Sequence, residues 1–169
     1  IEPDQRHADL IIKDLNLEDA KEVITPGEKD PKGKEVDTEE ELSPEQSTRY
    51  RGIVARANYL AADRPDIMYA TKEVCRQMAK PTVGGWKKLK RLGRYLKANA
   101  RTAIMYPWQG EESEITGYTD SDWAGCRVTG RSTSGDALMI GGHFLKCWSR
   151  TQNNVTCSSA EALSLIHIS

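Results

Sequence analysis

The sequence predicts an α+β fold in which helices come first and an antiparallel sheet follows. Apolar residues recur at helical spacing between residues 43 and 101, and the period changes to two between residues 114 and 151. The pair Gly141–Gly142 interrupts this alternating region as a hairpin turn would. Strands joined by short turns rather than by helices form a meander, so we expect a three-stranded antiparallel sheet followed by the start of a helix.

Length and composition are those of a small polar chain. It has 169 residues, of which 29% are charged, and its mean hydropathy is -0.63. No apolar run approaches the roughly 18 residues of a membrane span, and no secretory signal is visible. The four cysteines form no CxxC pair, which favours free thiols. We expect an intracellular protein, in a cytoplasmic particle or the nucleus, with no membrane partner.

Charge is distributed very unevenly along the chain. Residues 1–47 carry a net charge of -9, residues 48–110 carry +11 and residues 111–169 carry -3, although the whole chain carries only -1. A segment with such a basic excess is typical of proteins that bind a polyanion. The middle segment is therefore the candidate for contact with nucleic acid.

The first half of the chain predicts a short helix, a linker and a longer helix. Residues 8–19 can place three apolar side chains on one side of a helix. Residues 25–42 are rich in charge, Pro and Gly and have little to bury, which is typical of an exposed linker. The longer helix has a strong start signal, because Ser43 can cap it, Pro44 suits its first turn and Gln46 completes a capping box.

Two further helices follow before the period changes. Pro65 can open the first, and Pro81 with the Gly84–Gly85 pair breaks its pattern. The second is expected over residues 86–101, a stretch with no acid. Solvated helix faces normally mix charges of both signs, whereas a face of cations alone suits contact with phosphates. The candidate nucleic-acid-binding residues are Lys87, Lys90, Arg91, Arg94, Lys97 and Arg101.

The second half of the chain predicts the strands and the last helix. Residues 114–125, EITGYTDSDWAG, form one expected strand, and residues 132–152 form two more. A loop then leads into a helix that Ser158 or Ser159 can cap.

Two aspartates near the end of the first expected strand are candidate metal ligands. Asp120 and Asp122 point to the same face of a strand, and paired carboxylates can hold Mg²⁺, which prefers oxygen ligands. The spacing alone leaves solvated aspartates as the more frequent alternative. Glu161, at the start of the last expected helix, is in the right topological place to supply a further carboxylate.

Five motifs follow one another between residues 50 and 162, within a similarity that runs from about residue 8 to residue 162. They are YRGIVARANYLAADRPDI, WKKLKRLGRYLK, GYTDSDWAG, RSTSG and WSRTQNNVTCSSAEA. In this order they closely resemble the C-terminal part of the Pol polyprotein of copia-type LTR retrotransposons. Similar segments there close the reverse transcriptase and begin a ribonuclease H domain, whose motifs are YTDADWAG, RRSTSG, WSSKKQ and SSTEAEY.

The resemblance implies a domain order and a partial ribonuclease H-like fold. The expected segments are the end of the reverse transcriptase, a charged linker, a helical connection region, a truncated ribonuclease H domain and a tail without family character. Their boundaries are 1–24, 25–42, 43–106, 112–163 and 164–169.

The resemblance also implies an activity for the parent polyprotein. A ribonuclease H domain hydrolyses the RNA strand of an RNA–DNA hybrid with two Mg²⁺ ions. Asp120 matches the first catalytic aspartate, which binds these ions, whereas Asp122 matches a family residue without a direct role and is expected to be structural. The helix over residues 86–101 would lie along the hybrid. Expected partners are RNA–DNA hybrid or other nucleic acid and the remainder of the Pol polyprotein.

One departure from the family pattern puts catalysis by this chain in doubt. Glu161 matches the first Glu of SSTEAEY, and Leu163 stands where the second, catalytic Glu is expected. Glu161 would serve as a catalytic residue only if its helix shifted by one turn. The chain also lacks a Met start, so we expect an incomplete and inactive fragment of a nuclease. The alternative is a nucleic-acid-binding module that uses the helix over residues 86–101 without catalysis.

Overall fold

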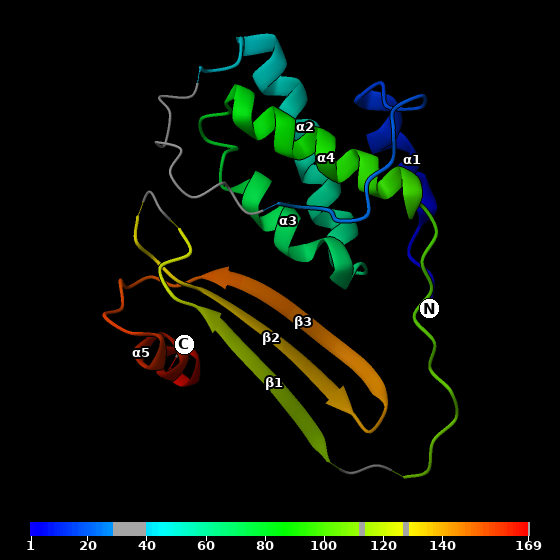
Figure 1. The fold of residues 1–169 in the computed structure, drawn as a ribbon. Helices are drawn as coiled ribbons and strands as arrows, with labels where there is room; N and C mark the ends of the chain where they lie inside the picture. Colours follow the sequence, from blue (N-terminus) through cyan, green and yellow to red (C-terminus); the bar gives the residue numbers. More distant parts are fainter. Residues whose placement is uncertain (29–39, 112–113, 127–128, 169) are drawn as a thin grey trace. The chain divides into compact units, whose positions relative to one another are not determined.

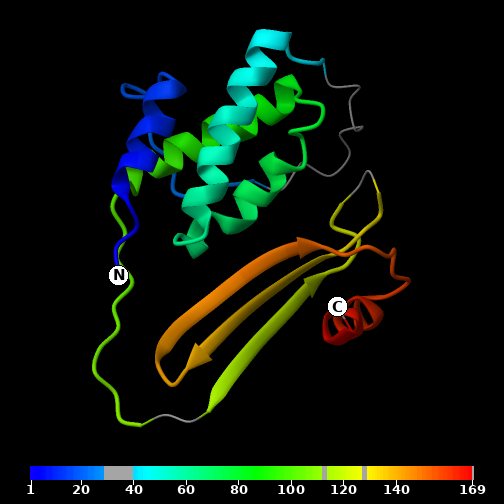
Figure 2. The same ribbon diagram turned by 180° about the vertical axis from the view of Figure 1, so that it is seen from behind.

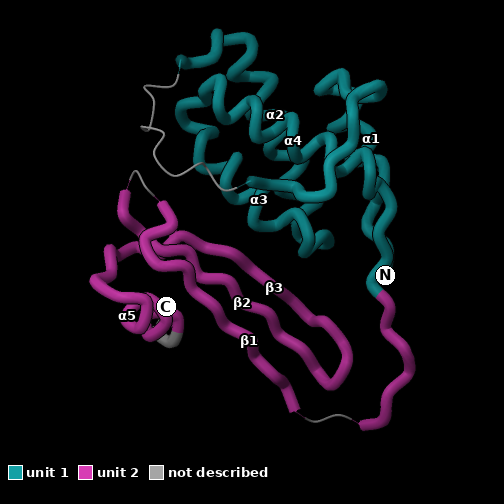
Figure 3. The backbone as a smooth tube through the Cα atoms, viewed as in Figure 1, with its two compact units in different colours: residues 1–104 teal, residues 105–169 magenta. Residues whose placement is uncertain are grey.

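The computed structural model describes residues 1–28, 40–111, 114–126 and 129–168. The chain divides into two compact units, residues 1–104 and residues 105–169 (Figure 3). Most of the predicted linker, residues 29–39, lies outside the described residues. Within the described parts of the chain, none of the helices combines the length and the apolar character needed to cross a membrane.

The helices of unit 1 are those that the periodicity predicts (Figure 1). They are α1 (Gln5–Asp14), α2 (Pro44–Ala61), α3 (Pro65–Cys75) and α4 (Val83–Ala98). The predicted start of α2 is confirmed, because the backbone N–H of Gln46 donates to Oγ of Ser43 at 3.3 Å.

Two helices begin earlier than predicted because of caps that the periodicity does not reveal. α1 begins at Gln5 because the Asp4 carboxylate accepts from the backbone N–H of Arg6, and the chain leaves the helical path at Asn16, whose φ is 53°. α4 begins three residues before Trp86, since Oγ1 of Thr82 accepts from the N–H of Gly85 at 3.1 Å. The Gly84–Gly85 pair therefore lies in the first turn of α4.

A single hydrophobic core holds unit 1 together. Ala8 and Ile11 of α1, Tyr50 of α2 and Leu89 of α4 are all fully buried in it. The phenol of Tyr50 donates to the Val74 carbonyl at 2.7 Å, which satisfies its one buried polar group. The segments 1–24 and 43–106, which the sequence suggests as separate, thus contribute to the same core.

Close packing of α4 against the chain after α1 predicts a cost for any side chain at Gly93. A Cβ there would lie 2.7 Å from Cδ1 of Leu17 and 2.8 Å from Cδ1 of Leu15. We expect Gly93→Ala to lower the free energy of unfolding by about 1–3 kcal/mol. The control is Gly52→Ala in α2, where a Cβ has no neighbour within 4 Å and the change should stabilise by up to about 1 kcal/mol. Urea denaturation measures both, and equal effects would contradict the packing argument.

Unit 2 contains the predicted antiparallel meander. β1 (Ile115–Asp122), β2 (Thr133–Ile140) and β3 (His143–Thr151) pair in this order. The hairpin turn lies at the predicted glycines, where Gly141 has a φ of 53°, a left-handed conformation that favours glycine. The α+β fold class is therefore confirmed.

The chain ends in a short helix beside the sheet. α5 (Ser159–Ser164) packs against β1 and continues into the 3₁₀ helix η1 (Leu165–Ile168) (Figure 2). Ser158 is its N-cap and accepts from the backbone N–H of Glu161 at 3.1 Å.

Candidate nucleic-acid interface

α4 carries one cationic stripe on the side opposite its buried residues. Leu89, Leu92 and Leu96 face the core, and α4 contains no acidic residue. At about 100° per residue, the five predicted cations within α4 fall on the opposite side, and Arg101 follows three residues after the helix end. We call these cations the α4 stripe: Lys87, Lys90, Arg91, Arg94, Lys97 and Arg101.

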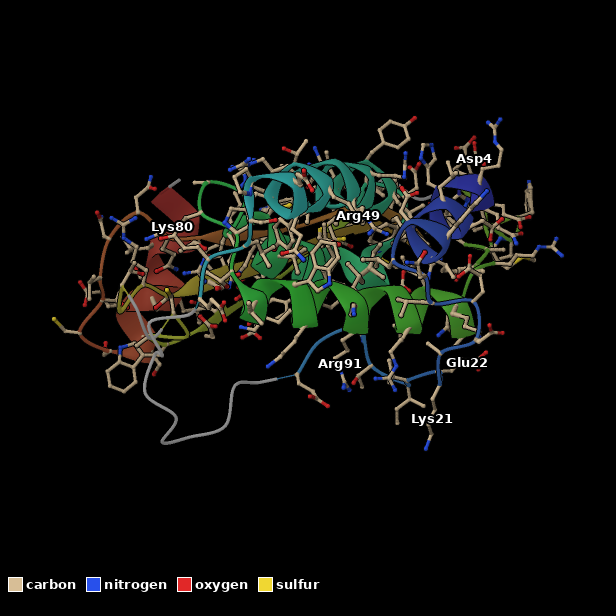
Figure 4. The ribbon with its side chains drawn as sticks, turned by 90° about the horizontal axis from the view of Figure 1, so that it is seen from above. Asp4, Lys21, Glu22, Arg49, Lys80 and Arg91 are labelled. Carbon is tan, nitrogen blue, oxygen red and sulfur yellow. The ribbon has the colours of Figure 1, made fainter. Side chains whose placement is uncertain are left out.

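Part of the α4 stripe is covered by the chain's own N-terminal segment. We call residues 20–28 the strap, and Figure 4 shows it beside α4, with Lys21, Glu22 and Arg91 labelled. The strap runs antiparallel to α4, so residues early in the strap contact the end of the helix. This covering is not foreseen in the sequence.

The strap contacts are made by backbone carbonyls and two side chains. Lys97 Nζ donates to the Ala20 carbonyl at 2.9 Å, and Arg94 Nε donates to the Lys21 carbonyl at 2.5 Å. Arg91 donates from Nη2 to Oγ1 of Thr25 at 2.8 Å and pairs through Nη1 with Glu28 at 2.5 Å.

The other cations of the stripe differ in their surroundings. Arg101, just beyond α4, pairs with Glu2 at 2.5 Å. Lys87 and Lys90 are exposed and contact no acceptor among the residues that the structure describes. The open part of the α4 stripe is therefore its N-terminal end.

The uneven charge of the sequence is partly balanced within the chain. Among the described residues, four ion pairs join an acid from residues 1–47 to a base from residues 48–110. They are Glu2–Arg101, Asp14–Arg56, Glu28–Arg91 and Glu41–Lys80. The acidic segment thus supplies some of the counter-charge that the sequence suggests a polyanion would provide.

A buried arginine, which the sequence analysis missed, fixes the end of α4 to the start of α3. The Arg64 side chain is 1% exposed and donates to both carboxylate oxygens of Asp66, at 2.8 and 2.7 Å. It also donates to the Asn99 carbonyl at 2.9 Å, while the Tyr95 hydroxyl donates to Asp66 at 3.0 Å. Burial of Asp66 would raise its pKa, but the bonds from Arg64 and Tyr95 outweigh this and hold the pKa below its usual value.

The two aspartates of the YTDSD motif have different environments. Asp120 is exposed on β1, and its Oδ1 accepts from the backbone N–H of Ser121 at 2.8 Å. The Asp122 carboxylate instead accepts from the backbone N–H of Thr133 and fills the space where a Cβ of Gly125 would lie. Asp122 therefore holds the turn that follows β1, which confirms its expected structural role.

Loss of the Asp122 carboxylate should weaken unit 2. We expect Asp122→Ala to lower its free energy of unfolding by about 1–3 kcal/mol, because the part-buried hydrogen bond from the N–H of Thr133 to the Asp122 carboxylate would be lost. Asp120→Ala is the matched control, and its effect should stay within about 0.5 kcal/mol because that side chain is exposed. Thermal unfolding followed by circular dichroism compares the two, and a larger loss for Asp120→Ala would refute this assignment.

The Glu161 carboxylate is bound to the backbone at the start of α5. Its Oε2 accepts from the backbone N–H of Cys157 at 2.7 Å, while its own N–H donates to Ser158. These reciprocal bonds resemble a capping box, and the spacing Ser158-x-x-Glu161 is the signal from which this role can be predicted. The contacts give Glu161 a local structural role in this chain.

The acidic residues that the structure describes do not assemble into a metal centre. No group of three or more His, Cys, Asp or Glu side chains that could hold an ion occurs within the described parts of the chain. Asp120 is an exposed carboxylate, and Glu161 is bound to backbone. The donor set does not fit the two-Mg²⁺ arrangement that the resemblance implies, because paired ions need several converging carboxylates.

Residues of the RSTSG and TQNNVT segments form a polar network that sequence reasoning left without a role. Ser132 Oγ accepts from the N–H of Ala124 and lies 3.1 Å from Oγ1 of Thr156, whose carbonyl accepts from the Trp123 indole at 3.1 Å. Gln152 donates to the Ala162 carbonyl at 2.6 Å. The network holds the loop after β1 and the start of α5 in place.

Comparison with known proteins gives several relatives from plants. The chain is 37% identical over 112 residues to the uncharacterized mitochondrial protein AtMg00810 of Arabidopsis thaliana, a match that covers 66% of this chain and 46% of that protein. It is 35% and 36% identical over 154 residues to the retrovirus-related Pol polyproteins from transposons RE2 and RE1 of the same plant. Each of these two matches covers 91% of this chain and 10% of the polyprotein.

The chain spans about half of the first relative and about a tenth of the polyproteins. No family model and no solved structure matches it. The similarity to the polyproteins extends over nine-tenths of the chain and agrees with the order of its five motifs. The chain is therefore homologous to the retrovirus-related Pol polyproteins of transposons.

Proposed function

We propose that this chain is a nucleic-acid-binding part of a retrotransposon Pol polyprotein, with RNA–DNA hybrid as its ligand. The α4 stripe is the observation that carries the proposal. It places cations along one side of a helix that contains no acid, and phosphates are the acceptors that such a linear array of Lys and Arg suits. Lys87 and Lys90, at the open end of the stripe, make the first contacts.

We further propose that unit 2 derives from a ribonuclease H domain of the parent polyprotein. The order of the motifs, the β1–β2–β3 meander and the position of α5 beside β1 support this origin. In the parent, Mg²⁺-dependent hydrolysis of the RNA strand would use Asp120 as a metal ligand. Because Leu163 stands where the resemblance places the catalytic Glu, we propose that this chain holds the hybrid without cleaving it.

The salt dependence of binding tests the proposal. Fluorescence anisotropy with a short labelled RNA–DNA hybrid should give an affinity that falls steeply between about 50 and 200 mM salt. Contacts from Lys87 and Lys90 alone correspond to a log–log slope of about -1.8, and the full stripe would approach about -5. An affinity that does not change with salt, or the absence of binding, would remove the α4 stripe as a phosphate-binding surface.

A matched pair of variants locates the surface. Lys87→Ala/Lys90→Ala should reduce the magnitude of the salt slope by about 1.8, because two phosphate contacts are lost. Lys13→Ala/Lys146→Ala makes the same change in net charge at exposed positions outside the stripe and should leave the slope as in the wild type.

A further inference from the structure

The strap occupies part of the surface that the proposed function assigns to nucleic acid. We propose that residues 20–28 act as an internal competitor, which must leave the α4 stripe before Arg91, Arg94 and Lys97 can bind phosphates. This inference rests on the proposed function and adds regulation to the same site. The geometry behind it is the set of contacts from Ala20, Lys21, Thr25 and Glu28 to these three cations.

The acceptors that the strap offers are weaker than phosphates. Two are neutral backbone carbonyls, one is a hydroxyl, and only Glu28 supplies a charge. A phosphate oxygen carries negative charge, so a bond from Arg or Lys to it adds an attraction between opposite charges that a neutral carbonyl or hydroxyl acceptor does not supply. Each cation that exchanges its strap acceptor for a phosphate therefore gains binding free energy.

The one charged contact of the strap is itself a weak one. The Glu28 side chain is 68% exposed, against 22% for Arg91, so solvent screens their attraction. Nε of Arg91 is buried and has no acceptor among the described residues. The strap thus leaves one donor of its central arginine unsatisfied, which also favours exchange for a phosphate.

The α4 stripe therefore binds the hybrid in two stages. Lys87 and Lys90 are open in the free protein and can meet the hybrid first. The apparent affinity is lowered by the fraction of molecules in which the strap is closed, so weakening the strap must raise the affinity.

Substitutions in the strap test whether it competes with the hybrid for the α4 stripe. The variant Thr25→Ala/Glu28→Gln removes the hydroxyl acceptor and the negative charge that face Arg91, and it should bind the labelled hybrid about two- to fivefold more tightly than the wild type. Glu22→Gln is the control for the loss of one negative charge, because Glu22 lies in the same segment and makes no contact with the stripe among the described residues. It should bind less than twofold more tightly.

Proteolysis reports the position of the strap directly. Trypsin cleaves after Lys21, whose carbonyl accepts from Arg94 in the free protein. Saturating hybrid should speed the release of fragment 1–21 several-fold, measured by mass spectrometry. In Thr25→Ala/Glu28→Gln this cleavage should be fast before hybrid is added.

The outcomes separate this inference from the function on which it rests. If the wild type and the strap variant bind the hybrid with the same affinity and cleavage after Lys21 does not change, the inference is wrong and the proposed function stands. If neither protein binds hybrid, both fail.

Discussion

Replacement of Asp66 by Ala is expected to lower the free energy of unfolding of unit 1 by about 3 kcal/mol. The Asp66 carboxylate forms two bonds with the guanidinium of Arg64, which is 1% exposed. Without it, Arg64 would keep a buried positive charge whose remaining partner is the Asn99 carbonyl. Urea denaturation followed by helical circular dichroism measures the loss, since the long helices belong to unit 1.

Two further variants give this prediction its controls. Asp63→Ala, at an exposed position three residues before Asp66, should change stability by less than about 0.5 kcal/mol. The double variant Arg64→Met/Asp66→Ala should be more stable than Asp66→Ala alone, because it removes the buried charge together with its partner. If the double variant is the less stable of the two, the cost does not come from an unpaired Arg64.

The same contact predicts how stability depends on pH. The folded pKa of Asp66 lies below its ordinary value of 3.8, because the bonds from Arg64 and Tyr95 outweigh the effect of burial. The stabilisation is therefore fully present above pH 3.8 and is lost as the pH falls through the lower, folded pKa. Asp66→Ala should show a smaller fall in stability over this acidic range than the wild type.

Charge reversal at the open end of the α4 stripe should produce the largest change in binding. We expect Lys87→Glu/Lys90→Glu to weaken binding of RNA–DNA hybrid on the order of 100-fold at low salt, because two phosphate contacts become two repulsions. Both side chains are exposed, so thermal stability should stay unchanged. Fluorescence anisotropy measures the affinity.

Lys13→Glu/Lys146→Glu is the control for overall charge. It makes the same change of -4 in net charge at exposed positions outside the stripe and should weaken binding less than tenfold. Equal losses in the two double variants would mean that the hybrid responds to net charge and not to α4.

The helices and strands were predictable because local signals determine them. Ser43 caps α2 as its sequence indicates, and the glycines at 141 and 142 turn the hairpin. The start of α4 at Val83 was missed although Thr82 is a good cap, because glycine in the next positions reads as a break. The capping role of Glu161 could also be predicted from the sequence, since Ser158 lies three residues before it.

The contacts that were missed join residues far apart in the sequence. Arg91 meets Thr25 across 66 residues, and Lys97 meets Ala20 across 77. The periodicity identifies the stripe on α4 but carries no information on what lies against it. Burial of Arg64 could not be predicted either, because the sequence Arg-Pro-Asp does not distinguish a surface ion pair from one whose arginine is buried.

The most direct test of nucleic-acid binding by the α4 stripe is lysine footprinting with and without RNA–DNA hybrid. Acetylation of Lys87 and Lys90, quantified by mass spectrometry, should fall several-fold when the hybrid is bound, while acetylation of Lys13 and Lys146 stays the same. Unchanged acetylation of Lys87 and Lys90 in a saturated complex would contradict the account, because the hybrid would then bind elsewhere on the chain.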